Sequence, residues 1–312
     1  MRGAGMRWPR IFVRGESGRV SRPERKPNLK IITTPAEMQC RSDAIRRAGK
    51  RISFIPTMGF LHEGHLSLMR EGRRRAEVVV ASIFVNPTQF APNEDFGRYP
   101  RAFERDCEMM KDVPVDLVFA PEPDAMYPAG AQTWVEAVEI TKGLCGAHRP
   151  GHFLGVTTVV AKLFNIVKPH YAMFGEKDFQ QLRAIQRMVE DLNFDLEIVP
   201  MPTVRESDGL AMSSRNAYLS ADERKRALSL SAALEAARSE FAAGARDPRA
   251  LVRAACAVLS ATPELRIEYI EAVDSESLAS IARVERPVVV AIAAKVGKTR
   301  LIDNAIFSPS AA

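Results

Sequence analysis

The chain has 312 residues, of which 46% are hydrophobic and 26% are charged, a composition typical of a globular protein. No apolar run approaches the roughly 18 residues of a membrane-spanning helix, and the first residues lack the apolar stretch of a secretory signal. The four cysteines lie far apart and form no C-x-x-C pair, which argues against a zinc cluster or disulfide framework and favours the cytoplasm.

The formal net charge of +6 is concentrated at the start of the sequence, because residues 1–28 hold eight Lys or Arg against two acids. Residues 29–312 are therefore formally neutral. The segment 1–28 is rich in Arg, Pro and Gly, and we expect it to be a disordered, dispensable extension. Nucleic-acid binding is an alternative that this basic segment suggests, but the neutral body argues against it.

From Leu29 onward, strand-like and helix-like segments alternate. Thr34 is predicted to cap the first helix, with Pro35 at its first position. Strands are predicted over 29–33, 51–57, 77–85, 115–121, 171–175 and 195–204, and helices over 34–48, 65–76, 101–112, 152–167 and 178–192. Two further helices, over 221–243 and 247–261, are followed by strands over 265–273 and 287–303.

This order predicts an α/β protein with a Rossmann-like, doubly wound, mostly parallel sheet, followed by a smaller α+β domain. We place the Rossmann-like domain at 29–204 and the C-terminal domain at 205–312. Ligands in such sheets bind beyond the carboxyl ends of the strands. Loops rich in Gly, Pro, His and Asn follow three of these strands, after Ile55, Val85 and Phe174.

The stretch "IPTMGFLHEGHLSL" places two of the chain's five histidines where a strand passes into a helix. Residues three apart lie on one helix face, so His62 and His65 can aim both rings at one ligand. Gly64 leaves the backbone open to close approach. Free N–H groups and the helix dipole make this position a ready anion site. Helix capping and a metal site are the alternatives, but the spacing is not that of H-E-x-x-H and no third ligand is evident nearby.

The pattern H-x-G-H after a strand resembles the signature of the nucleotidylyltransferase and class I aminoacyl-tRNA synthetase superfamily. The longer stretch "PTMGFLHEGHLSL" is more specific, and it resembles the pantothenate synthetase (pantoate–β-alanine ligase) family. That resemblance implies ATP-dependent condensation of (R)-pantoate with β-alanine through a pantoyl adenylate, which releases AMP and pyrophosphate. The other reading is a nucleotidylyltransferase that acts on a phosphorylated acceptor.

Other segments agree with this resemblance. In "SIFVNPTQF", Gln89 follows a strand and can bind a hydroxyl or carboxylate, although an Asn-Pro turn with a capping Gln gives the same letters. In "FGEKDFQQL", Gly175 permits close backbone approach, Lys177 offers charge to phosphate unless it is a plain surface lysine, and Asp178 can accept from ribose hydroxyls. Arg149, near a helix start, suits an anion or is merely a surface arginine.

The segment "SDGLAMSSRNAYLS" offers two hydroxyls and a guanidinium in a loop, which suits a mobile clamp for a triphosphate. It resembles the second signature of the superfamily, although by itself "SSRN" also fits an N-cap and turn. The expected phosphate-binding catalytic residues are His62, His65, Lys177, Ser213, Ser214 and Arg215.

The resemblance implies the remaining assignments. The full set expected to bind ATP is Pro56, Thr57, Met58, Gly59, His62, His65, Gly175, Glu176, Lys177, Asp178, Val204, Met212, Ser213, Ser214 and Arg215. The set expected to bind pantoate is Met58, Gln89, Arg149, Phe174 and Gln181. Mg²⁺ is the expected cofactor, with Asp106 as a candidate ligand, and the family implies a homodimer without nucleic-acid or membrane partners.

Overall fold

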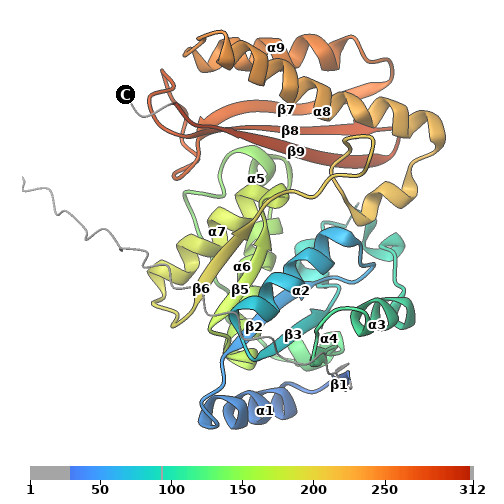
Figure 1. Ribbon diagram of the computed structural model, residues 1–312, viewed down its shortest axis with the longest axis vertical. Coiled ribbons are helices and arrows are strands. Elements are labelled where there is room, and N and C mark those ends of the chain that lie inside the picture. Colours follow the sequence, from blue (N-terminus) through green and yellow to red (C-terminus); the bar gives the residue numbers. More distant parts are fainter. Residues whose placement is uncertain (1–28, 93, 310–312) are drawn as a thin grey trace, which may run out of the picture.

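The computed structural model describes residues 29–92 and 94–309. The expected disorder of residues 1–28 therefore concerns a segment outside the described residues. Within them, two sheets lie one above the other in Figure 1, each covered by its own helices. No helix in the described ranges is both long enough and apolar enough to cross a lipid bilayer.

The larger sheet has six strands in the order β1-β4-β3-β2-β5-β6, and every pair in it is parallel. Parallel strands buried on both faces are continuous apolar runs, which is why segments such as "VVVASI" carry little alternation. The strands are β1 (Lys30–Ile32), β2 (Ile52–Thr57), β3 (Val78–Ile83), β4 (Leu117–Phe119), β5 (Tyr171–Gly175) and β6 (Glu197–Met201).

Helices cover both faces of this sheet. One apolar core joins a face of the sheet to α1, α6 and α7, and a second core joins the opposite face to α2 and α3. The helices are α1 (Pro35–Arg47), α2 (Glu63–Arg75), α3 (Phe103–Lys111), α4 (Pro123–Met126), α5 (Leu144–His148), α6 (His152–Val167) and α7 (Phe179–Asp191). Short 3-10 turns lie between them: η1 (Pro87–Gln89), η2 (Asp95–Arg98) and η3 (Glu176–Asp178).

Local signals explain several of these boundaries. The Thr34 side chain accepts from the backbone N–H of Glu37, and Pro35 occupies the first helical position, as predicted. Helix α6 begins and ends at the predicted residues. Strand β3 stops at Ile83, two residues earlier than predicted, and the chain leaves the sheet through Phe84 and Val85 before Asn86 caps the η1 turn.

The C-terminal part is a three-stranded antiparallel sheet covered by two helices. Its elements are η4 (Ser214–Tyr218), α8 (Ala221–Ala242), α9 (Pro248–Ser260), β7 (Leu265–Asp274), β8 (Val288–Val296) and β9 (Thr299–Phe307), with β8 in the centre. Helices α8 and α9 pack on one face, and Val289 and Ala291 on the other face meet Leu144 and Phe179 of the larger layer. The predicted fold class is confirmed, and the boundary at residue 205 remains a prediction.

Candidate active site

Strand β2 lies between β3 and β5. Strands β3 and β4 are added on one side of it, and strands β5 and β6 on the other side. The carboxyl ends of these strands leave a crevice at this switch point, where open α/β sheets bind their ligands. The loops after β2, β3 and β5 are the three that the sequence singled out. They meet at one edge of the sheet, below the C-terminal layer in Figure 1.

The loop after β2 is held by Asp106 of helix α3. The Asp106 carboxylate accepts from the backbone N–H groups of Phe60 and Leu61 at 2.7 and 2.8 Å. Gly59 has φ +79°, and a Cβ there would lie 3.0 Å from an Asp106 oxygen. The magnesium role assigned to Asp106 remains a prediction, and the geometry gives this buried carboxylate a loop-holding role, although burial raises its pKa.

The two histidines lie against each other at the start of α2. The His62 backbone N–H donates to Nδ1 of His65 at 3.3 Å, and the ring centroids are 4.1 Å apart. Because Nδ1 of His65 accepts, a neutral ring carries its proton on Nε2. The remaining ring nitrogen of His65 is then a hydrogen-bond donor for a ligand.

Both rings are neutral near pH 7. Burial, aided by the charge of Lys177, lowers the pKa of His62 to about 4. Burial together with the neighbouring His62 lowers the pKa of His65 to about 3. The pair therefore offers neutral N–H donors, which do not need a counter-charge when the site is empty.

Gly64 has a specific function in this arrangement. A Cβ at Gly64 would lie 2.9 Å from Cε1 and 3.0 Å from Nδ1 of His62. The sequence suggested that Gly64 admits close approach, and the group that approaches here is the imidazole of His62 itself. Any larger residue at this position would push that ring out of its place.

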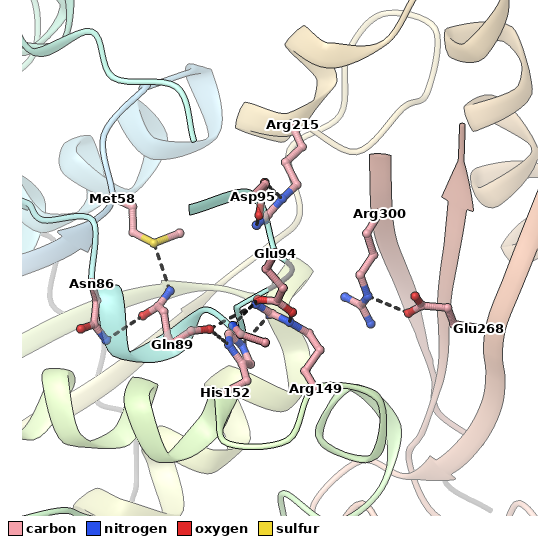
Figure 2. A network of polar contacts seen from close by, with 11 residues as sticks. Met58, Asn86, Gln89, Glu94, Asp95, Arg149, His152, Arg215, Glu268 and Arg300 are labelled. Carbon is pink, nitrogen blue, oxygen red and sulfur yellow. Dashed lines mark hydrogen bonds and ion pairs between the residues drawn. The ribbon is translucent and has the colours of Figure 1, made fainter. Parts of the chain in front are cut away.

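The loop after β3 fixes the amide of Gln89. Asn86 Nδ2 donates to Gln89 Oε1 at 3.2 Å and to the Gly155 carbonyl at 3.1 Å, while Gln89 Nε2 lies 3.0 Å from the Met58 sulfur (Figure 2). Helix α6 comes this close only because residue 155 is glycine, since a Cβ would lie 2.4 Å from the Thr88 carbonyl oxygen. Gln89 is therefore oriented before any ligand binds.

The loop after β5 is held by the C-terminal sheet. Asn304 of β9 donates to the carbonyls of Glu176 and Lys177, at 2.9 Å each. The Lys177 ammonium lies 3.6 Å from the Asp178 carboxylate. Burial would raise the pKa of Asp178, but Lys177 and Arg215 together hold it below its usual value, so this carboxylate is ionised.

The clamp segment, residues 205–215, crosses from the C-terminal layer to the loop after β2. The Ser214 hydroxyl donates to the Phe60 carbonyl at 3.2 Å, and the Ser213 hydroxyl accepts from the backbone of Arg215 at 3.2 Å. Arg205, at its start, pairs with Asp303 of β9 at 2.7 and 2.9 Å. Both ends of the segment are thereby tied to neighbouring structure.

Arg149 and Arg215, which were expected to bind anions, each face an acid at the start of η2 (Figure 2). Arg215 donates two bonds of 2.9 Å to Asp95, and Arg149 donates bonds of 2.6 and 2.5 Å to Glu94. Sequence reasoning missed these pairs, because nothing in the letters "NEDFGRYPR" shows which cation each acid will meet.

One cavity, here the first cavity, brings the predicted residues together. Except for Gly59, Glu176, Arg149 and Asp106, every residue assigned to ATP, pantoate or magnesium lines it. The sequence analysis missed its apolar wall, which comes from α6. The residues of this wall are Val156, Val159, Val160 and Leu163. Their signal was available, since α6 is apolar on nearly all sides, as a helix buried in the core must be.

A second cavity lies between the two layers and shares a wall with the first. Lys177, Asp178, Gln181, Ser213 and Arg215 line both. Arg149 lines only the second, and its assignment to pantoate remains a prediction. The far wall of the second cavity comes from the C-terminal sheet and includes Glu268, Tyr269, Lys295 and Arg300.

Comparison with known proteins agrees with this arrangement. Residues 30–306 match the family described as pantoate-beta-alanine ligase. The chain belongs to this family. A relative from Geobacter sulfurreducens, named pantothenate synthetase, is 55% identical over 279 residues, which span 89% of this chain and 99% of the relative. A pantothenate synthetase from Thermotoga neapolitana is 54% identical over 279 residues, 89% of this chain and 100% of the relative.

Solved structures of the same family share the fold. The pantothenate synthetase of Thermus thermophilus superposes with a TM-score of 0.84 and 46% identity, covering 88% of this chain and 98% of that one. A pantoate-beta-alanine ligase from Francisella tularensis, complexed with beta-gamma ATP and beta-alanine, gives a TM-score of 0.74 and 32% identity over 89% of this chain and 97% of its own. The resemblance stated from the motifs is confirmed.

Proposed function

We propose that this chain is a pantoate–β-alanine ligase that joins (R)-pantoate to β-alanine and converts ATP to AMP and pyrophosphate. The observation that carries the proposal is the first cavity. Phosphate donors from α2, η3 and the clamp segment converge there with the amides of Gln89 and Gln181. Family membership supports the same reaction.

In the first half-reaction, a carboxylate oxygen of pantoate attacks the α-phosphorus of ATP, and pyrophosphate leaves. Negative charge grows on the phosphoryl oxygens in this step. We assign the stabilisation of that charge to His62, His65 and Lys177, which all line the first cavity and offer N–H donors and a positive charge. Fixed donors of this kind lower the barrier more than solvent does, because they need no reorganisation during the reaction.

In the second half-reaction, the amine of β-alanine attacks the acyl carbon of pantoyl adenylate. The acyl–oxygen bond to AMP breaks, the amide forms, and the amine loses a proton. We assign to Gln89, whose amide is oriented by Asn86, the role of holding pantoate through both steps. No covalent bond to the protein is required, so the main contribution is positioning.

Magnesium fits this site only as a partner of the nucleotide. The described residues hold no group of three or more His, Cys, Asp or Glu side chains that could bind a metal ion by themselves. Mg²⁺ commonly uses one or two carboxylates together with substrate phosphates. Asp178, ionised in the first cavity, is the carboxylate that fits this role best, and the ion would neutralise the triphosphate. Asp106, the ligand expected from the resemblance, would have to give up its bonds to the backbone of Phe60 and Leu61 to take it.

The homodimer and the cytoplasmic location are likewise proposals. They rest on the family resemblance and, for the location, on the four cysteines without C-x-x-C spacing. The nucleotidylyltransferase alternative shares the histidine motif. It differs in its product, since it transfers a nucleotide and forms no amide.

The test is an assay of the purified protein with ATP, Mg²⁺, pantoate and β-alanine, omitting each component in turn and identifying the products by mass spectrometry. We expect pantothenate and AMP only in the complete mixture. Nucleotide transfer without amide formation would support the alternative. No consumption of ATP in any mixture would contradict both.

A paired variant tests the role of the histidines. His65→Ala is expected to fold normally and to form the adenylate at least about tenfold more slowly, because one transition-state donor is lost. The control is His170→Ala, which removes a ring whose Nδ1 accepts from the Ile52 backbone at the opposite end of β2. An unchanged rate in His65→Ala would contradict the assignment.

A further inference from the structure

Arg300 lies in the second cavity, on the wall that the C-terminal sheet supplies. Its Nε donates to Glu268 Oε2 at 2.7 Å, and Figure 2 shows this pair across the gap from Arg149 and Glu94. Lys295 lies 3.5 Å from the other oxygen of the same carboxylate. One carboxylate thus faces two cations, so Arg300, Lys295 and Glu268 together carry a net positive charge.

The guanidinium of Arg300 is only partly satisfied. Its side chain is 19% exposed, and its Nη2 atom is enclosed without a hydrogen-bond partner among the described residues. A guanidinium has five N–H donors, and buried donors in native structures are almost always paired. The partly exposed guanidinium therefore keeps donor capacity that its bond to Glu268 does not use.

The other two arginines in Figure 2 differ from Arg300. Arg149 and Arg215 each make two bonds to a carboxylate of their own. Arg300 makes one bond to a carboxylate that it shares with Lys295. Among these three arginines, Arg300 has the most free capacity for an anion.

We propose that Arg300 and Lys295 form a subsite for inorganic pyrophosphate, the leaving group of the first half-reaction. The inference rests on the proposed function. Lys177, Ser213 and Arg215 line both cavities, so the second cavity adjoins the place where the anion would be released. A ligand with several negative charges, such as pyrophosphate, can contact several separated cations at once, whereas a ligand with one carboxylate cannot. Arg also binds phosphate oxygens in a bidentate manner.

The test is isothermal titration calorimetry of the full-length protein with sodium pyrophosphate at constant ionic strength. Arg300→Met is expected to weaken pyrophosphate binding about tenfold, because a charge-assisted bond is lost. Glu268→Gln is expected to tighten it several-fold, because Arg300 and Lys295 are then released from their carboxylate. Since Glu268→Gln keeps Arg300 in place, it tests the subsite even where Arg300→Met does not fold.

The opposite signs separate a binding role from a structural one. If the pair only stabilised the C-terminal sheet, both variants would weaken binding together or leave it unchanged, and either result would overturn the proposal. The matched control is Arg226→Met, which breaks an ion pair of 2.6 Å with Glu264 in the same layer but outside the second cavity. It should leave pyrophosphate affinity unaltered.

A titration with β-alanine distinguishes the ligand. If Arg300→Met weakened β-alanine binding and left pyrophosphate binding intact, the subsite would serve the amine substrate and the proposal would be wrong. Because calorimetry does not depend on turnover, it reports on the subsite independently of the ligase assay. Failure of that assay with these binding shifts intact would contradict only the ligase reaction.

Discussion

At the scale of single residues, two neutral imidazoles stand where a phosphate site often has lysine or arginine. Burial keeps the rings of His62 and His65 uncharged, with pKa values of about 4 and 3. Lys177 is close enough to lower the pKa of His62 further, because it would repel a charged imidazole. In the proposed phosphate site, neutral donors would bind ATP without repelling one another strongly when it is absent.

This neutrality has a measurable effect on stability. The unfolded chain binds a proton at each histidine below a pH of about 6.5, whereas the folded chain does not until about pH 4 or 3. Folding stability is therefore complete above pH 6.5 and falls as the pH is lowered. At pH 5, the resistance of His65 to protonation in the folded state should alone lower the free energy of unfolding by about 2 kcal/mol.

From pH 7 to pH 5, we predict that the free energy of unfolding falls by about 2 kcal/mol less in His65→Gln than in the wild type. Glutamine stays neutral in both the folded and the unfolded state, so this share of the pH dependence disappears. Urea unfolding at the two pH values measures the difference. Identical losses in both proteins would show that His65 is not held neutral by the fold.

At the scale of elements, β9 supports the loop after β5 and the clamp segment from the C-terminal layer. Asp303 binds Arg205, which begins the clamp segment, and the next residue, Asn304, holds the carbonyls of Glu176 and Lys177. Two neighbouring residues of one strand thus fix two walls of the first cavity. The amide of Asn304 suits this position because it donates both bonds from one nitrogen.

We predict that Asn304→Asp raises the KM for ATP and lowers the adenylation rate about tenfold in total, with a loss of stability of about 1–2 kcal/mol. A carboxylate of the same shape cannot donate, and it would face two carbonyl oxygens. Steady-state kinetics at varied ATP concentration measures the effect. The control is Asn165→Asp, since Asn165 donates to Ala161 within α6, away from the site. Equal kinetic effects in both variants would contradict this role for Asn304.

The sequence predicted the order of elements and most of the first cavity because its signals are local. Alternating apolar runs and helical periods mark the layers, and His62, His65 and Lys177 stand in short motifs next to strand ends. The pairs Arg149–Glu94 and Arg215–Asp95 could not be predicted. They join segments distant in sequence, and the residues around an acid in a polar loop do not indicate which cation it will pair with.

At the scale of the whole molecule, the clamp segment makes polar contacts with both layers. Arg205 pairs with Asp303, whose side chain is only 2% exposed, while Ser214 contacts the loop after β2. Val289 of the C-terminal sheet packs against Phe179 of the larger layer. The Arg205–Asp303 pair therefore links the position of the clamp to the packing of the layers.

We predict that Arg205→Met destabilises the protein by about 2–3 kcal/mol, because it leaves the buried Asp303 carboxylate without its cation. The double variant Arg205→Met/Asp303→Asn should recover part of this loss, since no buried charge remains unpaired. The control is Arg187→Met, which breaks an exposed pair with Glu190 of 3.1 Å and should cost less than about 1 kcal/mol. Chemical unfolding of the four proteins, including the wild type, gives the comparison. If Arg205→Met cost no more than Arg187→Met, the ion pair with Asp303 would not anchor the clamp segment to β9, and the Ser214 contact with the loop after β2 would have to hold the segment in place.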